Sequence, residues 1–436
     1  MSKIMKVCIV LTVVAFLAAP AFAEVQNVKV SGDIKTMGIY RDNFDLIDAT
    51  ASSYDDQQAW YQSIARIQID ADLTDNVSTC VRILNERDWD VETNADSDMD
   101  LDIATITMKE LFMAPLTVII GRQELKYGSG LVVGDPDRND ASTGDSITAV
   151  NYSARKAFDA IRAIIDLDNV TIDAFTAKIN EGVAATSSVG NDIDLYGVDV
   201  STTIGDIPAA VYVVYANDNQ SAAGVNNEEI LTVGARGSKA ITDALNASLE
   251  VAVQIGTYNA IRDQKAWALD AAVDYAMNAS MNPIVGASYS FRSGANTSAS
   301  STSDQEAWLP LYEDQTQGLI ADFLFDGTNY GVNSNCHIIN VNATVEPMED
   351  LTASIDYYQY LLDEKLAAGS QTVGRLSTTM KADSDFGSEI DLGLNYAYTE
   401  DVAFGLTSAW FNPGAAFDGV NDDQATEVVG SVSVSF

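Results

Sequence analysis

The last residues of the chain show the most regular alternation of apolar and polar side chains. From Val428 to Phe436, the even positions hold valine, glycine and the final phenylalanine, and the odd positions from Ser431 onward hold serine. Successive side chains of a β-strand point to opposite faces, so this segment predicts a strand with one apolar and one polar face. An ordinary edge or sandwich strand shows the same pattern, whereas a closed barrel must pair its last strand with its first.

The same alternation recurs along most of the chain. In one early segment, Ile67 and Ile69 alternate with Arg66, Gln68 and Asp70. Such a period of two predicts strands rather than helices. The clearest predicted strands lie at 28–40, 60–73, 77–89, 101–113, 116–123, 157–166, 170–178 and 426–436.

The predicted connections are alternately long and short. Short ones lie at 74–76, 114–115, 168–169, 205–206, 239–243, 277–281, 347–350 and 399–401. Long ones lie at 41–59, 90–100, 127–140, 180–190, 217–227, 256–264, 293–335, 363–386 and 413–424. This alternation is typical of an up-and-down transmembrane barrel with short periplasmic turns and longer external loops. We therefore predict an all-β fold, an antiparallel barrel of about eighteen strands with both termini on the periplasmic side.

The first residues predict export of the chain. Two lysines precede an apolar run at 7–19, and Ala21-Phe22-Ala23 follows as a cleavage site. This is the pattern of a secretory signal peptide, so we expect residues 1–23 to be removed and 24–436 to form a single barrel domain. No run of eighteen apolar residues occurs after this segment, so the sequence predicts no membrane-spanning helix. The terminal Phe436 and its strand resemble the segment that the assembly machinery reads in bacterial outer-membrane barrels. Together these observations predict that the protein lies in the bacterial outer membrane.

Composition narrows the function classes. The chain has 63 acidic and 24 basic residues and a net charge of −39, which argues against nucleic-acid binding. Only Cys80 and Cys336 lie beyond the signal peptide, so disulfides are not the expected means of stabilisation. The single histidine, His337, argues against a multi-histidine metal site. We expect neither an enzyme nor a bound cofactor.

Several short patches, in order along the chain, resemble a known family. The longest is Val118-Ile119-Ile120-Gly121-Arg122-Gln123-Glu124-Leu125-Lys126-Tyr127-Gly128, which continues through 131–135. Further patches lie at 156–162, 309–312, 387–392 and 411–414. Together they resemble the alginate export family of outer-membrane porins. The resemblance implies an eighteen-stranded barrel with an arginine-rich constriction that passes an anionic polysaccharide; the strongly acidic net charge of this chain departs from that picture.

Strand parity selects the side chains that we expect to line the pore. Arginines flanked by apolar neighbours alternate with carboxylates on the same predicted face, so the predicted wall is mixed in charge. Most of the acidic excess then belongs to loops and turns. The predicted pore-lining and solute-binding residues are Arg66, Arg82, Arg122, Arg162, Arg236, Arg292, Asp70 and Glu86. The 293–335 connection is the longest and is the expected plug or constriction loop.

Acidic residues in two connections raise the question of calcium. Asp96, Asp98, Asp135 and Asp137 supply the oxygen ligands that Ca²⁺ prefers, but their spacing does not fit an EF-hand. A solvated external loop explains these residues more simply. If Ca²⁺ binds there, it stiffens a loop or bridges to lipopolysaccharide.

The sequence therefore predicts a passive outer-membrane porin. Its solute would be a polysaccharide, an oligosaccharide or another small hydrophilic molecule, met in the lumen by charge-assisted hydrogen bonds. Its other partners would be outer-membrane lipid, lipopolysaccharide and the assembly machinery. Two alternatives stay open: a general or cation-preferring porin, and a barrel that serves as a surface adhesin or enzyme.

Overall fold

The structure is a computed structural model of the chain. It describes residues 26–47, 56–90, 99–136, 147–181, 192–219, 228–295, 303–326, 331–417 and 422–436. The predicted signal peptide and the calcium candidates Asp96, Asp98 and Asp137 lie outside these ranges. Within them, no helix is long and apolar enough to cross a membrane.

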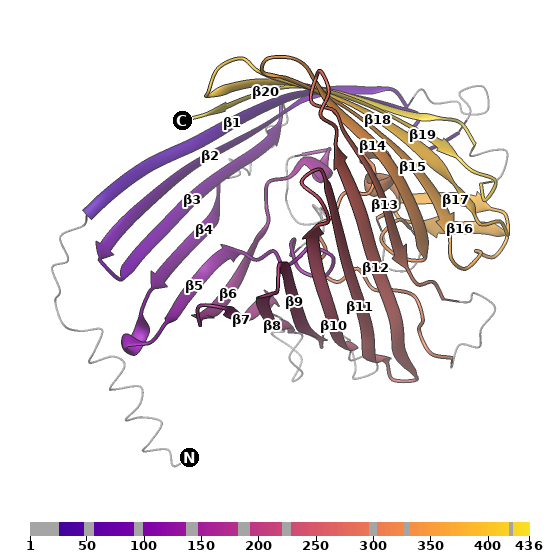
Figure 1. The fold of residues 1–436 in the computed structure, drawn as a ribbon. Coiled ribbons are helices and arrows are strands. Elements are labelled where there is room, and N and C mark those ends of the chain that lie inside the picture. The colour runs from indigo at the N-terminus through magenta and orange to yellow at the C-terminus, as the bar shows by residue number, and fades with distance from the viewer. Residues whose placement is uncertain are drawn as a thin grey trace.

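Eighteen antiparallel strands form one closed sheet (Figure 1). Each strand of this sheet pairs with the one before and the one after it along the chain, except that β15 pairs with β18 because β16 and β17 form a separate hairpin. The first strand pairs with both the second and the last. The strands are β1 (Gln26–Asp42), β2 (Gln58–Thr74), β3 (Val77–Asp88), β4 (Met99–Met108), β5 (Leu116–Glu124), β6 (Ala157–Asp166), β7 (Val170–Asn180), β8 (Ile193–Ile204), β9 (Ile207–Asp218), β10 (Glu228–Ala240), β11 (Leu245–Asn259), β12 (Arg262–Ala276), β13 (Ile284–Arg292), β14 (Cys336–Met348), β15 (Leu351–Leu362), β18 (Asp385–Ala397), β19 (Val402–Pro413) and β20 (Ala425–Ser435). The predicted barrel is confirmed.

The chain end closes the barrel as its alternation predicted. Phe436 and Gly32 exchange two backbone hydrogen bonds of 2.9 and 3.0 Å, which fixes β20 against β1. Phe436 is 61% exposed on the outer face, whereas Val429, of the opposite parity, is buried inside. The apolar face of this strand therefore points toward lipid and the serine face toward the lumen.

Exposure along β2 shows the same division of faces. Ile67 is 52% exposed and Ile69 is also exposed, whereas Gln62 and Ile64 are buried. In a soluble protein exposed isoleucines would lie in water, but in a membrane barrel the outward positions are solvated by lipid. Side chains that share parity with Gln62 therefore face the lumen.

Two expected loops differ in the structure. The connection predicted at 256–264 is a tight turn, because β11 extends to Asn259 and β12 begins at Arg262. The Asn259 side chain accepts a hydrogen bond of 3.1 Å from the Ile261 backbone, an Asx-type turn that ends the strand without a loop. The connection predicted at 363–386 contains the hairpin of β16 (Gly369–Val373) and β17 (Leu376–Met380).

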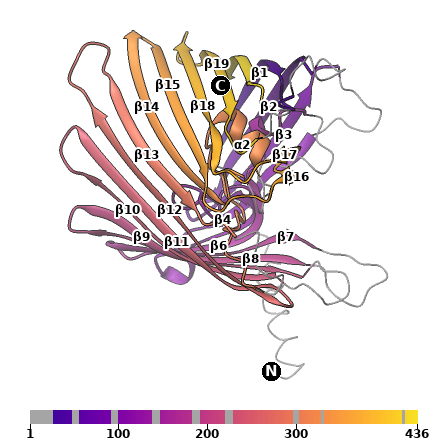
Figure 2. The same ribbon diagram turned by 90° about the vertical axis from the view of Figure 1, so that its right-hand side faces the viewer.

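Two of the long connections enter the lumen. The β13–β14 connection carries the short helix α2 (Leu319–Phe325), which lies within the ring of strands beside β16 and β17 (Figure 2). Its apolar residues pack on lumen-facing side chains of β14, β15, β18 and β19. The β5–β6 connection packs in the same way on β6 to β9, β11 and β12 through Leu125, Leu131 and Val133. The lumen is therefore partly filled by the protein's own loops.

Candidate channel lumen

Five of the predicted pore arginines share the lumen-facing parity, and each has a carboxylate partner. Four ion pairs span 2.5 to 2.9 Å, and in the fifth Arg82 contacts both Asp102 and Glu124. The other four pairs are Arg66 with Asp33, Arg162 with Asp173, Arg236 with Asp199, and Arg292 with Asp270. The guanidinium charges are therefore balanced where they stand. Four of the five arginines pair with a carboxylate of the adjacent strand, whereas Arg236 on β10 reaches over β9 to Asp199 on β8.

Arg122 corrects the sequence prediction, because it lies on the outer face of the barrel. Arg122 is in register with Asp159 and forms an ion pair of 3.3 Å with it. The Asp159 side chain is 64% exposed. The exposed Ile120 and Ile161 share this parity. Gln123, the next residue, is the one that points inward, and its amide donates to three backbone carbonyls. The exposed residues that share its parity exclude Arg122 from the pore.

The two predicted acidic residues face the lumen and differ in their contacts. Asp70 accepts a hydrogen bond of 2.9 Å from Gln68. Glu86 is fully buried and accepts hydrogen bonds from the Ser153 hydroxyl at 2.9 Å and the Ala154 backbone at 2.5 Å. Glu86 thus holds the end of the β5–β6 connection against the wall.

Two strap-like segments of the inward loops run side by side. Val133 and Tyr312 form an isolated parallel bridge, and Gly134 donates to the Tyr312 carbonyl at 2.7 Å. Asp135, expected in a solvated external loop, is instead fully buried on one of these straps and pairs with Lys156 at 2.5 Å. An acidic residue in a polar loop was expected to face water, and the lysine partner is what makes its burial tolerable.

A second carboxylate lies where these two segments meet. Asp314 contacts Lys126 at 2.6 Å and Lys156 at 3.1 Å. Burial opposes its charge, but these two ammonium groups outweigh burial and hold the pKa of Asp314 below its usual value. The two lysines and two aspartates form a polar junction that the sequence did not reveal, because their partners are up to 188 residues apart.

The helix α2 is fixed to the wall by carboxylates of β18. Glu389 accepts hydrogen bonds of 2.8 Å from the backbone of Ile320 and of Ala321. Asp391 accepts one of 3.3 Å from Leu319. These are the first backbone donors of the helix, which have no partner inside it. The apolar end of the helix is held by Phe325, whose ring lies 4.7 Å from that of Phe386.

Buried acids also lie within the β13–β14 loop itself. Burial raises the pKa of Asp322 to about 8, with a further contribution from Asp326. Burial, followed by the charges of Asp322 and Asp326, also raises the pKa of Glu313 well above its usual value. Asn333 donates to Glu313 at 3.0 Å and to Asp326 at 3.3 Å.

These acids predict a pH dependence of the packed loop. A carboxyl whose pKa is raised on folding binds a proton more tightly in the folded state. The stabilisation of the packed loop by this bound proton is fully present below the ordinary carboxyl pKa of about 4. It is lost as the pH rises through about 8, the pKa of Asp322. We expect current fluctuations in single channels to increase as the pH rises from about 4 to about 8 and to lose this dependence in Asp322→Asn. Identical pH curves for the two proteins would contradict this prediction.

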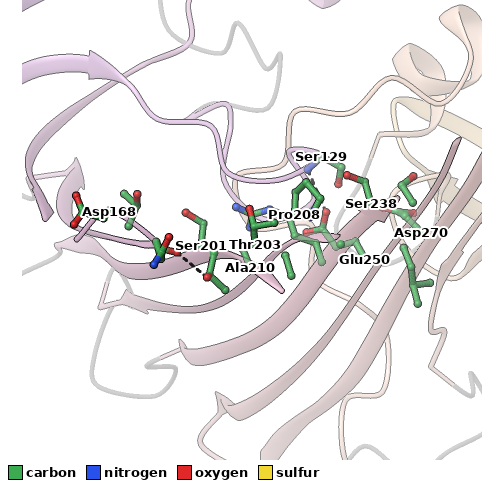
Figure 3. A pocket seen from close by; sticks show the side chains of 17 residues that line it. Ser129, Asp168, Ser201, Thr203, Pro208, Ala210, Ser238, Glu250 and Asp270 are labelled. Carbon is green, nitrogen blue, oxygen red and sulfur yellow. Dashed lines mark hydrogen bonds between the residues drawn. The ribbon is translucent and has the colours of Figure 1, made fainter. Parts of the chain in front are cut away.

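A polar cavity of about 580 Å³ lies between the β5–β6 connection and the wall of β7 to β12 (Figure 3). At one end, near the short turns, it is lined by Asp168, Ser201 and Thr203. At the other end Ser129, Glu250 and Asp270 gather, where the Ser129 backbone donates to Glu250 at 3.1 Å. Hydroxyls, carboxylates and the Arg236 guanidinium give this cavity donors and acceptors that match sugar hydroxyls.

The geometry agrees with comparisons to known proteins. The family model described as Alginate export matches residues 27–431. Among solved structures, Pseudomonas aeruginosa OccD3 (OpdP) is similar at 12% identity and TM-score 0.54, covering 95% of this chain and 93% of that one. OpdO of the same organism has 12% identity, TM-score 0.56 and coverage of 94% and 97%.

OccK5 (OpdH), also from Pseudomonas aeruginosa, has 12% identity, TM-score 0.55 and coverage of 94% and 99%. At such identities these structures support the fold alone. A search of the curated proteins finds no match. The family match spans almost the whole barrel, so the chain belongs to the alginate export family and is an outer-membrane β-barrel channel of a bacterial cell.

Proposed function

We propose that the protein is a passive, non-catalytic channel for small hydrophilic solutes, with oligosaccharides among them. The observation that carries this proposal is the polar cavity under Ser129, because it is a hydroxyl-lined space in a lumen that is partly filled by loops. Sugar hydroxyls can exchange hydrogen bonds with its serines, threonines and carboxylates. Weak, multiple contacts of this kind favour passage over tight retention.

The paired arginines argue against a lumen built for polyanions. A uronate carboxylate would have to compete with Asp199 for Arg236 and with Asp270 for Arg292, both already in contact at 2.7 and 2.8 Å. Displacing a partner leaves that aspartate without its counter-charge in a partly buried site, which is costly. We therefore propose neutral solutes before anionic ones.

The test is solute entry into liposomes that carry the purified barrel. We expect swelling with monosaccharides and disaccharides and slower swelling as the sugar lengthens. Ser201→Trp should slow entry because the indole fills the cavity, whereas Val213→Trp, on the lipid-facing side, should leave it unchanged. A folded barrel that admits no sugar, or that is blocked by uronate oligomers more strongly than by neutral ones, would contradict the proposal.

A further inference from the structure

The two inward loops are joined backbone to backbone where they cross the lumen. Tyr312 donates a hydrogen bond to the Val132 carbonyl at 3.1 Å and accepts one from Gly134 at 2.7 Å. Asp314 donates to the Gly130 carbonyl at 2.8 Å. The two backbones are therefore fixed to each other. We call the joined segments the crossbar, which comprises residues 130–135 and 312–315.

Close packing and ion pairs also hold the crossbar in place. A Cβ atom at Gly134 would lie only 2.4 Å from the Asp314 Cβ atom, so the two segments approach more closely than any other residue at this position allows. Lys156 contacts Asp314 at 3.1 Å and the buried Asp135 at 2.5 Å. Breaking a buried ion pair leaves an uncompensated charge, so the backbone of the crossbar is not the part that moves readily.

One side chain of the crossbar bridges to the wall at an end of the polar cavity. The amide group of Gln315 donates hydrogen bonds of 2.9 Å to the Ser129 hydroxyl and to the Asp270 carboxylate, and its oxygen accepts one of 2.6 Å from Arg292. Ser129 and Asp270 line this end of the cavity, whereas the other end reaches the exposed turn residue Asp168 (Figure 3). Gln315 therefore closes the cavity on the side of the crossbar.

Gln315 can leave this position without exposing a charge. Arg292 contacts Asp270 directly at 2.8 Å, so these two groups stay paired when the amide moves away. The Gln315 backbone is held separately, because its N–H group donates to Glu313 at 2.8 Å. The side chain is half-buried and neutral, so its release costs hydrogen bonds only and no buried charge loses its counter-charge.

We propose that Gln315 is the gate of the polar cavity and selects solutes by size, an inference that rests on the channel function proposed above. A hydroxyl group both donates and accepts, so a sugar in the cavity can replace the amide at Ser129 and at Asp270. The Gln315 side chain then turns aside while the crossbar stays in place. Because one side chain sets the width of this passage, longer sugars pass more slowly than short ones.

The test is sugar entry into liposomes that carry the full-length barrel, with glucose and raffinose as the probes. Gln315→Ala should speed raffinose entry by roughly fivefold or more, because the closed arrangement loses at least two net hydrogen bonds. Glucose entry should rise less, since the shorter sugar needs a smaller opening. Gln315→Trp should slow both sugars, because the indole fills the passage.

The matched control is Gln317→Ala. Gln317 is half-buried on the same connection, but its amide donates at 3.4 Å to Ser290 on β13 rather than to a residue that lines the cavity. Its replacement should leave both entry rates unchanged. Heat-modifiability gels show whether each variant folds.

Two outcomes separate the gate from the channel. If folded Gln315→Ala and Gln315→Trp barrels admit both sugars at the wild-type rates, Gln315 is not the gate and the channel function stands. Folded barrels of the wild type and both variants that admit neither sugar would overturn the channel function, and the gate with it.

Discussion

Replacing Arg41 with alanine is expected to destabilise the barrel more than any other single loss of an arginine partner. Arg41 and Glu427 join the first and last strands at 2.5 Å, and their side chains are only 3% and 2% exposed. The guanidinium carbon also lies 4.0 Å from the Phe323 ring centre of the helix α2. Without Arg41, Glu427 keeps a buried charge with no counter-charge, which costs about 3–5 kcal/mol.

The measurement is the temperature at which the folded band disappears in heat-modifiability gels. The matched control is Arg66→Ala, which breaks the pair between Arg66 on β2 and Asp33 on β1, where the side chains are 29% and 31% exposed. A pair of that exposure contributes about 0–1 kcal/mol, so this variant should melt close to the wild type. Equal shifts of the melting temperature in the two variants would show that burial of the ion pair between β1 and β20 does not set the stability of the barrel.

Short-range pairing in this barrel could be read from the sequence, and long-range pairing could not. The alternation of apolar and polar residues places Arg162 in the lumen, and the short turn after β6 brings it beside Asp173, 11 residues away. Nothing local links Arg41 to Glu427, which is 386 residues distant. That contact depends on the strand number and on the register at closure, which a one-residue slip would change.

The burial of residues in the inward loops could not be predicted from the sequence, for a different reason. Asp135 sits in a polar, glycine-rich connection, a composition that predicts exposure. Its burial depends on Lys156 and on the strap at Tyr312, which belong to separate segments. The alternation of inward and outward side chains gave no guidance for Asp135, because it applies to strands and not to loops. Arg122 was predicted in the pore, but its register with Asp159 and the exposure of Ile120 and Ile161 place it on the outer face.

Replacing Glu389 with alanine is expected to release the helix α2 from the wall and to raise the single-channel conductance. Glu389 is fully buried and accepts the backbone hydrogen bonds of Ile320 and Ala321 at 2.8 Å each. An intramolecular hydrogen bond contributes about 0.5–1.5 kcal/mol, so losing both shifts the packed helix toward the detached state by roughly fivefold to a hundredfold. The strand ladder does not involve this side chain, so the heat-modifiability transition should stay unchanged.

The control for this prediction is Glu389→Gln, which keeps one carbonyl oxygen able to accept from either backbone donor. Its amide group cannot accept the second bond, so we expect a conductance between the wild type and the alanine variant. Phe325→Ala removes an apolar contact of the helix, with Phe386 and Phe411, and should raise the conductance independently of any carboxylate. If both Glu389→Ala and Phe325→Ala conduct as the wild type does, the helix does not limit the pore, and the straps at Asp135 and Asp314 must set the conductance instead.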